Sequence, residues 1–208
     1  RNVGEYFDVY RKTPMHDWHV KNKAEFENVG QWKRAWYYPK NNESMHDAVQ
    51  RESKAARDSA GILDASTLGK IDIQGTDASE FLNRVYTNAW SKLDIGKCRY
   101  GLMLNEDGMV YDDGVTTRLN ENHYIMTTTT GGAATVLGKL EDYLQTEWPE
   151  LDVYLTSVTD HYATISVCGP KSKKIISQVI PNLDLSDDNF PHMSFKDTKI
   201  NEIKCRVM

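Results

Sequence analysis

Two adjacent aspartates, Asp112 and Asp113, are the side chains of this sequence whose type and placement most directly suggest proton chemistry. They lie in residues 109–119, a run rich in β-branched and aromatic residues. The hairpin signal Asp107-Gly108 stands just before it. Such a run after a turn predicts a β-strand.

Successive side chains of a strand point to opposite faces, so the two carboxylates cannot share one environment. One face would carry Met109, Tyr111, Asp113, Val115, Thr117 and Leu119, and the other Val110, Asp112, Gly114, Thr116 and Arg118. Asp113 thus falls on the mostly apolar face. A carboxylate among apolar neighbours is costly unless it is paired, protonated or in use. We therefore interpret Asp113 as the functional candidate and Asp112 as a solvated strand residue.

The elements around these aspartates predict an α+β fold of antiparallel sheets with packed helices. Residues 98–104, 109–119 and 123–129 read as a three-stranded meander. Ser44 with Asp47 forms a capping box that opens a helix, and Asp77 with Glu80 caps a second one. Further elements are a strand over 70–74, a helix after Gly131-Gly132, strands over 153–158 and 162–167, a helix between Gly169-Pro170 and Pro181, and a final strand over 199–208.

The first 43 residues are polar and aromatic without a clear period, so we expect an extended, aromatic-rich arm over residues 1–43 and a folded domain over 44–208. Hydrophobic residues make up 39% of the 208, which supports a soluble globular core. A net charge of −5 without a basic block argues against nucleic acid as a partner. No apolar run approaches the roughly 20 residues that span a bilayer, so no membrane partner is expected.

Three cysteines, Cys98, Cys168 and Cys205, lie far apart and are odd in number, which favours a reducing, cytoplasmic setting over a disulfide scaffold. No signal-peptide pattern opens the chain, and its start at Arg1 suggests a fragment or a processed product. His16 and His19 have a spacing that could suit a metal, but no third ligand follows in sequence, so no metal site is expected.

Four consecutive threonines, residues 127–130, end the third strand of the meander. They fit either a solvated β-edge, since threonine is a good strand former, or a hydroxyl-lined wall beside a polar ligand. Gly131-Gly132 after them fits either a plain turn or a close backbone approach at a helix N-terminus. The sequence contains no Gly-x-Gly-x-x-Gly fingerprint for a dinucleotide.

Residues 97–113 resemble the folate-dependent aminomethyltransferase family, which includes the T-protein of the glycine cleavage system. The shared pattern is a tyrosine, a few apolar residues, Leu-Asn, a turn with glycine, and an Asp pair. Further matching pieces are residues 61–69, 73–78 and 167–170. Within the family, residues 10–18, 30–36 and 126–132 are most similar to the C-terminal folate domain of the heterotetrameric sarcosine oxidase α subunit.

This resemblance implies a pterin pocket in the front half of a T-protein-like domain. It places the essential aspartate at Asp113 and pterin-lining positions at Leu68, Tyr100 and Val115. Thr128 or Thr129 falls where T-protein has an asparagine. The family continues with a Thr-Gly-Glu type segment that this sequence does not reach before Met208, so we expect a domain truncated at its C-terminal end.

The implied activity is the capture of the iminium carbon from N-methylamine oxidation as 5,10-methylenetetrahydrofolate. Tetrahydrofolate is the implied ligand, and the other subunits of a sarcosine-oxidase-like complex are the implied partners. Flavin and NAD would bind only to other parts of such an enzyme. Two alternatives stay open: a module that binds folate without catalysis, and a surface for subunit interaction.

Overall fold

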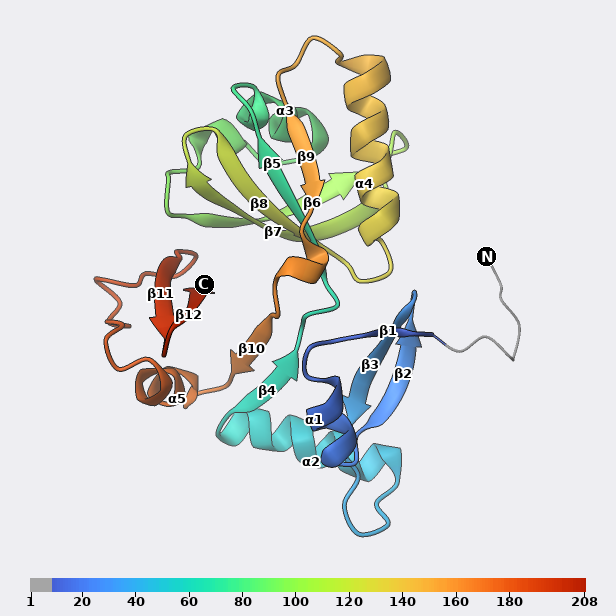
Figure 1. The fold of residues 1–208 in the computed structure, drawn as a ribbon, viewed down its shortest axis with the longest axis vertical. Coiled ribbons are helices and arrows are strands. Elements are labelled where there is room, and N and C mark those ends of the chain that lie inside the picture. The colour runs from blue at the N-terminus through green and yellow to red at the C-terminus, as the bar shows by residue number, and fades with distance from the viewer. Residues whose placement is uncertain (1–8) are drawn as a thin grey trace. The chain divides into compact units, whose positions relative to one another are not determined.

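The computed structural model describes residues 9–208, which form an α+β fold of helices and mostly antiparallel strands (Figure 1). The chain divides into two compact units. Among the described residues, unit 1 comprises residues 9–67 and 161–175, and unit 2 comprises residues 68–160 and 176–208. Helix α5 (Ser172–Val179) contributes residues to both.

Unit 1 begins with a three-stranded sheet of order β1-β3-β2. Its elements are β1 (Arg11–Lys12), α1 (His16–Lys21), β2 (Glu25–Val29) and β3 (Trp32–Tyr37). The expectation of an extended arm is therefore wrong for residues 11–37; residues 1–8 of that arm lie outside the described part. The apolar residues of these short elements do not recur at helix or strand spacing. Aromatic contacts stabilise the elements instead. The Arg11 guanidinium lies 4.0 Å from the centre of the Trp32 ring, for example.

Helix α2 (Met45–Asp58) begins where the capping box predicted. The Asp47 amide donates to the Ser44 hydroxyl at 3.2 Å, and the Ser44 amide donates to the Asp47 carboxylate at 3.3 Å. The helix leads into β4 (Gly61–Asp64), which pairs antiparallel with β10 (Ile165–Cys168). The helix belongs to the same unit as the residues before it, so the division found differs from the one expected at residue 43.

A buried group of polar side chains joins α1 to β4 inside unit 1. The Nε2 atom of His19 lies 2.8 Å from Oδ2 of Asp64, and its Nδ1 lies 2.6 Å from the Tyr38 hydroxyl. The Ser66 amide donates to the other Asp64 oxygen at 3.1 Å. Burial by itself would raise the pKa of Asp64, but the hydrogen bonds from Ser66, Thr13 and His19 outweigh it and lower that pKa.

Unit 2 is built on a five-stranded antiparallel sheet of order β6-β7-β8-β5-β9. The strands are β5 (Gly69–Gln74), β6 (Cys98–Leu104), β7 (Val110–Asn120), β8 (His123–Thr128) and β9 (Tyr154–Ser157). The predicted meander is thus confirmed as β6-β7-β8. Helices α3 (Ala78–Val85) and α4 (Ala133–Asp142) cover one face of this sheet (Figure 1). The core between them is formed by Ile71, Ile73, Phe81, Leu82, Tyr124, Met126, Val136 and Leu140.

Three short helical turns complete the helical content of residues 9–208: 3₁₀ turns over Trp90–Lys92 and Thr159–His161, and a π-helical turn over Tyr143–Glu147. The last strands, β11 (Lys196–Ile200) and β12 (Ile203–Val207), form an antiparallel hairpin. The prediction of one strand over 199–208 is therefore wrong, because Asn201 turns the chain with φ +52°. None of the helices over residues 9–208 is long and apolar enough to cross a membrane.

Gly69 should not tolerate a larger side chain, because β5 approaches the start of α4 closely there. A Cβ at Gly69 would overlap the Thr128 hydroxyl and lie 2.6 Å from the Ala133 Cβ. We expect Gly69→Ala to lower the free energy of unfolding by about 1–3 kcal/mol. Gly138→Ala is the matched control, since that glycine lies within α4 with no atom near its Cβ position; it should stabilise by about 0.5–1 kcal/mol. Denaturant unfolding of both variants measures this, and equal effects would contradict the close approach.

Asp64 should make unit 1 sensitive to acid. Because its folded-state pKa is lowered, its stabilising contribution is present above the unfolded pKa of about 3.9 and is lost as the pH falls through the folded value. We expect Asp64→Asn to lower the free energy of unfolding at pH 7 by about 1.5–3 kcal/mol and to flatten the acid limb of the stability curve. Asp58→Asn, an exposed carboxylate in the same unit, should change stability by less than about 0.5 kcal/mol. Urea titrations between pH 3 and pH 7 test this; an unchanged acid limb in Asp64→Asn would refute it.

Candidate functional site

Strand β7 places the two adjacent aspartates on opposite faces of the unit 2 sheet, as the alternation of side chains predicted. Their burial is the reverse of what the sequence indicated. Asp112 is only 4% exposed, whereas Asp113 is partly exposed. The interpretation of Asp112 as a solvated residue is therefore wrong. Its face of β7 is the one that turns toward α3 and α4, and apolar residues from the other strands make that face the core.

Asp113 lies beside Tyr100 on the face away from the two helices. The Tyr100 hydroxyl donates to Oδ2 of Asp113 at 2.8 Å. Oδ1 of Asp113 accepts no hydrogen bond from any described residue. In the β6–β7 ladder Tyr100 is opposite Val115 and Leu102 is opposite Asp113, so Tyr100, Asp113 and Val115 share this face. Three of the residues expected at the site are thus brought together.

Tyr100 is 51% exposed, and its hydroxyl bonds to the Asp113 carboxylate. Its hydrogen bond to Asp113 raises the pKa of the Tyr100 hydroxyl above the ordinary value. The hydroxyl therefore stays protonated through the neutral range and acts as a permanent donor to the carboxylate. A carboxylate held on one oxygen by a fixed donor can accept a proton or a hydrogen bond on the other.

The threonines at the end of β8 are committed to bonds inside unit 2. Thr128 is 2% exposed, and its hydroxyl donates to the Thr129 carbonyl at 3.0 Å. The Thr129 hydroxyl donates to Oδ1 of Asp112 at 2.6 Å and accepts from the Gly132 amide at 3.2 Å. Each hydroxyl has a single proton, so neither is free to donate to a ligand. Of the two readings left open for this run, a solvated edge does not describe Thr128.

Leu68 precedes β5 by one residue, next to the position where Gly69 pairs with Thr128. Its carbonyl accepts a hydrogen bond from the ammonium of Lys70 at 3.0 Å. Lys70 is only 4% exposed, and sequence reasoning did not select it. A lysine that alternates with Ile71 and Ile73 has the pattern of an exposed strand residue, so no sequence signal distinguished it.

Asp112 is the second residue that sequence reasoning did not assign to the site. Both of its carboxylate oxygens lie 3.3 Å from the Thr129 amide, in addition to the bond from the Thr129 hydroxyl. Burial raises the pKa of Asp112, and the hydrogen bonds from Thr129 work in the opposite direction. Its pairing with the Thr129-to-Gly132 turn could have been suspected from the adjacency of an Asp pair, a threonine run and two glycines.

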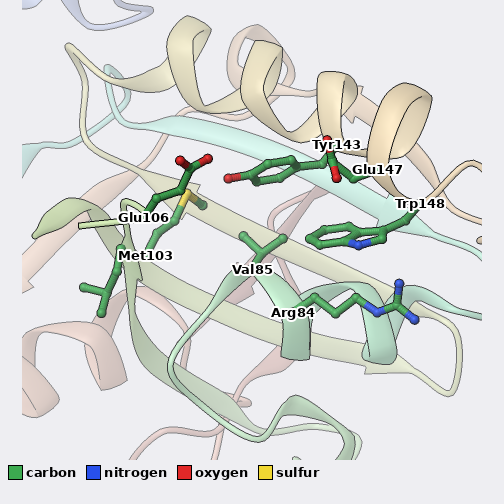
Figure 2. A pocket seen from close by; sticks show the side chains of 8 residues that line it. Arg84, Val85, Met103, Glu106, Tyr143, Glu147 and Trp148 are labelled. Atoms are coloured by element: carbon green, nitrogen blue, oxygen red, sulfur yellow. The ribbon is translucent and has the colours of Figure 1, made fainter. Parts of the chain in front are cut away.

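A cavity of about 290 Å³ lies elsewhere in unit 2, on the helix side of the sheet. Figure 2 shows Glu106 and Arg84 at opposite ends of it, with the Tyr143 and Trp148 rings along one side. None of the expected site residues lines this cavity. Across residues 9–208, no group of three or more His, Cys, Asp or Glu side chains is arranged to hold a metal ion.

Comparison with known proteins gives a family and two kinds of relative. The model of the GCVT N-terminal domain matches residues 15–208. The sarcosine oxidase α subunit of Corynebacterium sp. (strain U-96) is 57% identical over all 208 residues, which cover 22% of that subunit. An aminomethyltransferase of Corynebacterium aurimucosum is 32% identical over 82% of this chain and 43% of its own length.

A solved structure has a similar fold. The crystal structure of the glycine cleavage aminomethyltransferase T from Bartonella henselae superposes with a TM-score of 0.71 at 24% identity, covering 81% of this chain and 43% of that one. This chain spans about a fifth of the length of the sarcosine oxidase α subunits that it matches. Because the family model covers nearly the whole sequence, the chain belongs to the GCVT N-terminal domain family, whose relatives named above are enzymes or enzyme subunits.

Proposed function

We propose that this chain is the tetrahydrofolate-facing part of a one-carbon-transfer domain in a sarcosine-oxidase-like α subunit. The observation that carries this proposal is the Asp113 carboxylate, which Tyr100 holds on one oxygen and which presents the other on a half-exposed sheet face. The 57% identity to a sarcosine oxidase α subunit supports the assignment to that kind of enzyme. The activity, substrate and partners of the whole protein are all part of the proposal.

The side chains on this face suit a reduced pterin. The exposed Tyr100 ring and the half-buried Val115 offer a flat, apolar wall, and Asp113 offers a hydrogen-bond acceptor beside it. Small-molecule sites combine such apolar surface with a few fixed polar groups. Leu68 would extend the wall from the start of β5. The hydroxyls of Thr128 and Thr129 already donate to protein acceptors. These two residues would therefore contribute only carbonyl oxygens and shape to the pterin site.

Bound tetrahydrofolate would supply the nitrogen nucleophile that takes the carbon of an iminium formed by oxidation of an N-methylamine. That nitrogen must lose a proton as the new bond forms. Asp113 would accept this proton, or stabilise the cationic nitrogen, through its free oxygen. Tyr100 would keep the carboxylate oriented. The second folate nitrogen would then displace the amine from the transferred carbon, the amine leaving with a proton, and the product would be 5,10-methylenetetrahydrofolate.

The setting inferred for this reaction is a complex in the cytoplasm. Flavin and NAD chemistry would take place in other parts of the enzyme and on other subunits. The three cysteines within residues 9–208 are free, which is compatible with a reducing compartment.

Replacing the Asp113 carboxylate should separate carbon transfer from amine oxidation. In the full-length subunit within its complex, we expect Asp113→Asn to slow formation of 5,10-methylenetetrahydrofolate by about 10²–10⁴-fold, because general base catalysis contributes on that order. Amine oxidation at the separate flavin site should be unchanged. Parallel assays of oxidation and of methylenetetrahydrofolate measure both steps.

Asp94→Asn is the matched control for charge, since Asp94 is an exposed aspartate of the same unit without a side-chain hydrogen bond in the described structure. It should leave both activities intact. Equal loss of oxidation and transfer in Asp113→Asn would assign this residue a folding role. Full transfer activity in Asp113→Asn would sink the proposal, and would leave a binding or subunit-interaction module as the better assignment.

Removing the Tyr100 hydroxyl should weaken transfer less than removing the carboxylate. We expect Tyr100→Phe to lower the transfer rate by about 10-fold or less, because the aromatic wall remains and only one charge-assisted hydrogen bond is lost. Tyr100→Ala should in addition raise the KM for tetrahydrofolate, since it removes the wall. Steady-state kinetics with varied folate tests this ordering, and a larger defect in Tyr100→Phe than in Asp113→Asn would contradict it.

A further inference from the structure

Asp112 takes no part in the proposed chemistry, yet it is the more deeply buried member of the aspartate pair. It is 4% exposed and bonds to Thr129 through both the amide and the hydroxyl of that residue. A buried carboxylate without an ionic partner is costly, so its retention requires these bonds. The question is what they hold in place.

The β7–β8 ladder stops before it reaches the aspartates. Its pairs run from Asn120 opposite His123 to Thr116 opposite Met126, and no regular pair of this ladder follows beyond that point. At Val115 the Thr127 hydroxyl takes over: it accepts from the Val115 amide at 2.9 Å and lies 3.1 Å from the Val115 carbonyl oxygen. Further along β7, the Asp112 carboxylate accepts a hydrogen bond from the Thr129 amide. Side chains thus replace the backbone ladder along this edge of β7.

This edge of β7 is closely packed, and it leaves no room for larger side chains at two glycines. A Cβ at Gly114 would overlap the carbonyl oxygen of Thr127, and a Cβ at Gly132 would lie 2.9 Å from Oδ1 of Asp112. The Thr129 hydroxyl in turn accepts a hydrogen bond from the Gly132 amide at the start of α4. The Asp112 carboxylate therefore ties three things together: strand β7, the turn over residues 129–132, and the N-terminus of α4, where a negative charge is favoured.

Asp113 depends on this tie because it is the next residue of the same strand. On its β6 side it is held by the ladder, opposite Leu102. On its β8 side the side-chain links among the described residues come from the Thr127 hydroxyl, which bonds to Val115, and from the Asp112 carboxylate, which bonds to Thr129. If the Asp112 bonds were lost, this end of β7 would be free to twist, and the Asp113 oxygen would move relative to Tyr100.

We propose that Asp112 is a positioning residue for carbon transfer: its bonds to Thr129 fasten the free edge of β7 and thereby aim the Asp113 carboxylate across the opposite face of the sheet. This inference rests on the proposed function of Asp113. It also gives Thr129 an indirect role, through Asp112 and the turn, in place of a side-chain contact to the ligand.

The test uses the full-length subunit in its complex and the pair Thr129→Val and Thr129→Ser. Valine removes the hydroxyl at nearly constant volume, whereas serine retains it. We expect Thr129→Val to lower kcat for methylenetetrahydrofolate formation by about 10-fold with little change in KM, and Thr129→Ser to restore it to within about twofold. Amine oxidation should be unchanged in both. Thr146→Val, an exposed threonine outside the site, is the control for loss of a hydroxyl.

A double-mutant comparison separates positioning from direct ligand contact. If Thr129 acts through Asp112, then Asp112→Ala combined with Thr129→Val should be no worse than the more damaging single variant, because residues that share one interaction are not additive. Multiplicative defects, or a rise in KM confined to Thr129→Val, would overturn the proposal in favour of direct contact. Wild-type kcat in Thr129→Val would also overturn it, and this outcome does not depend on whether Asp112→Ala folds.

Failure of this inference and failure of the proposed function give different results. If Asp113→Asn keeps full transfer activity, the proposed function is wrong, and the positioning role falls with it. If Asp113→Asn is inactive while Thr129→Val is fully active, only the positioning role is wrong. Amide hydrogen exchange over residues 127–133 adds a readout independent of activity: faster exchange there in Thr129→Val than in Thr129→Ser supports the tie, and identical exchange refutes it.

Discussion

The strict alternation of side chains along β7 is the constraint on which the candidate site depends. Two consecutive aspartates cannot face the same side of a strand, so one carboxylate enters the interior of unit 2 and the other faces away from it. The interior carboxylate is stable only because Thr129 supplies it with two kinds of donor. The outward carboxylate is left with one bond, from Tyr100, and one oxygen available for chemistry. Adjacency in sequence thus places two aspartates in two different environments.

A buried, hydrogen-bonded aspartate also occurs in unit 1, where it has no link to the proposed reaction. Asp64 is buried, accepts from the Ser66 amide, and meets a histidine that is itself bonded to Tyr38. In both units a buried aspartate of a β-strand bonds through its side chain to a segment that is not paired with that residue in a ladder. Burying the carboxylate costs desolvation free energy. The hydrogen bonds from hydroxyl and amide donors offset that cost. Burial of an aspartate alone is therefore not a signature of catalysis in this protein.

Much of the fold could be predicted because its signals are local. The capping box at Ser44, the turn residues at Asp107-Gly108 and the alternation over β7 each act within a few residues. The strands of residues 11–37 and the last hairpin were missed for the opposite reason. The first elements are stabilised by contacts such as that of Arg11 with Trp32, and the hairpin depends on a left-handed turn at Asn201. Neither feature produces a periodic pattern of apolar residues in the sequence.

The sequence by itself determined the family, the strand, and the fact that Asp113 and Val115 share one face, since motif and alternation are properties of the chain alone. The register between β6 and β7 then placed Tyr100 on that same face. Only the tertiary structure decided which face is buried. The face of Asp112 looks polar along β7, but Ile71, Met103, Tyr124 and Met126 from other strands, together with α3 and α4, make it the core. Burial is a property of the whole layer, and residues distant in sequence set it. A single strand therefore shows which side chains are together, while its neighbours decide whether they meet water or protein.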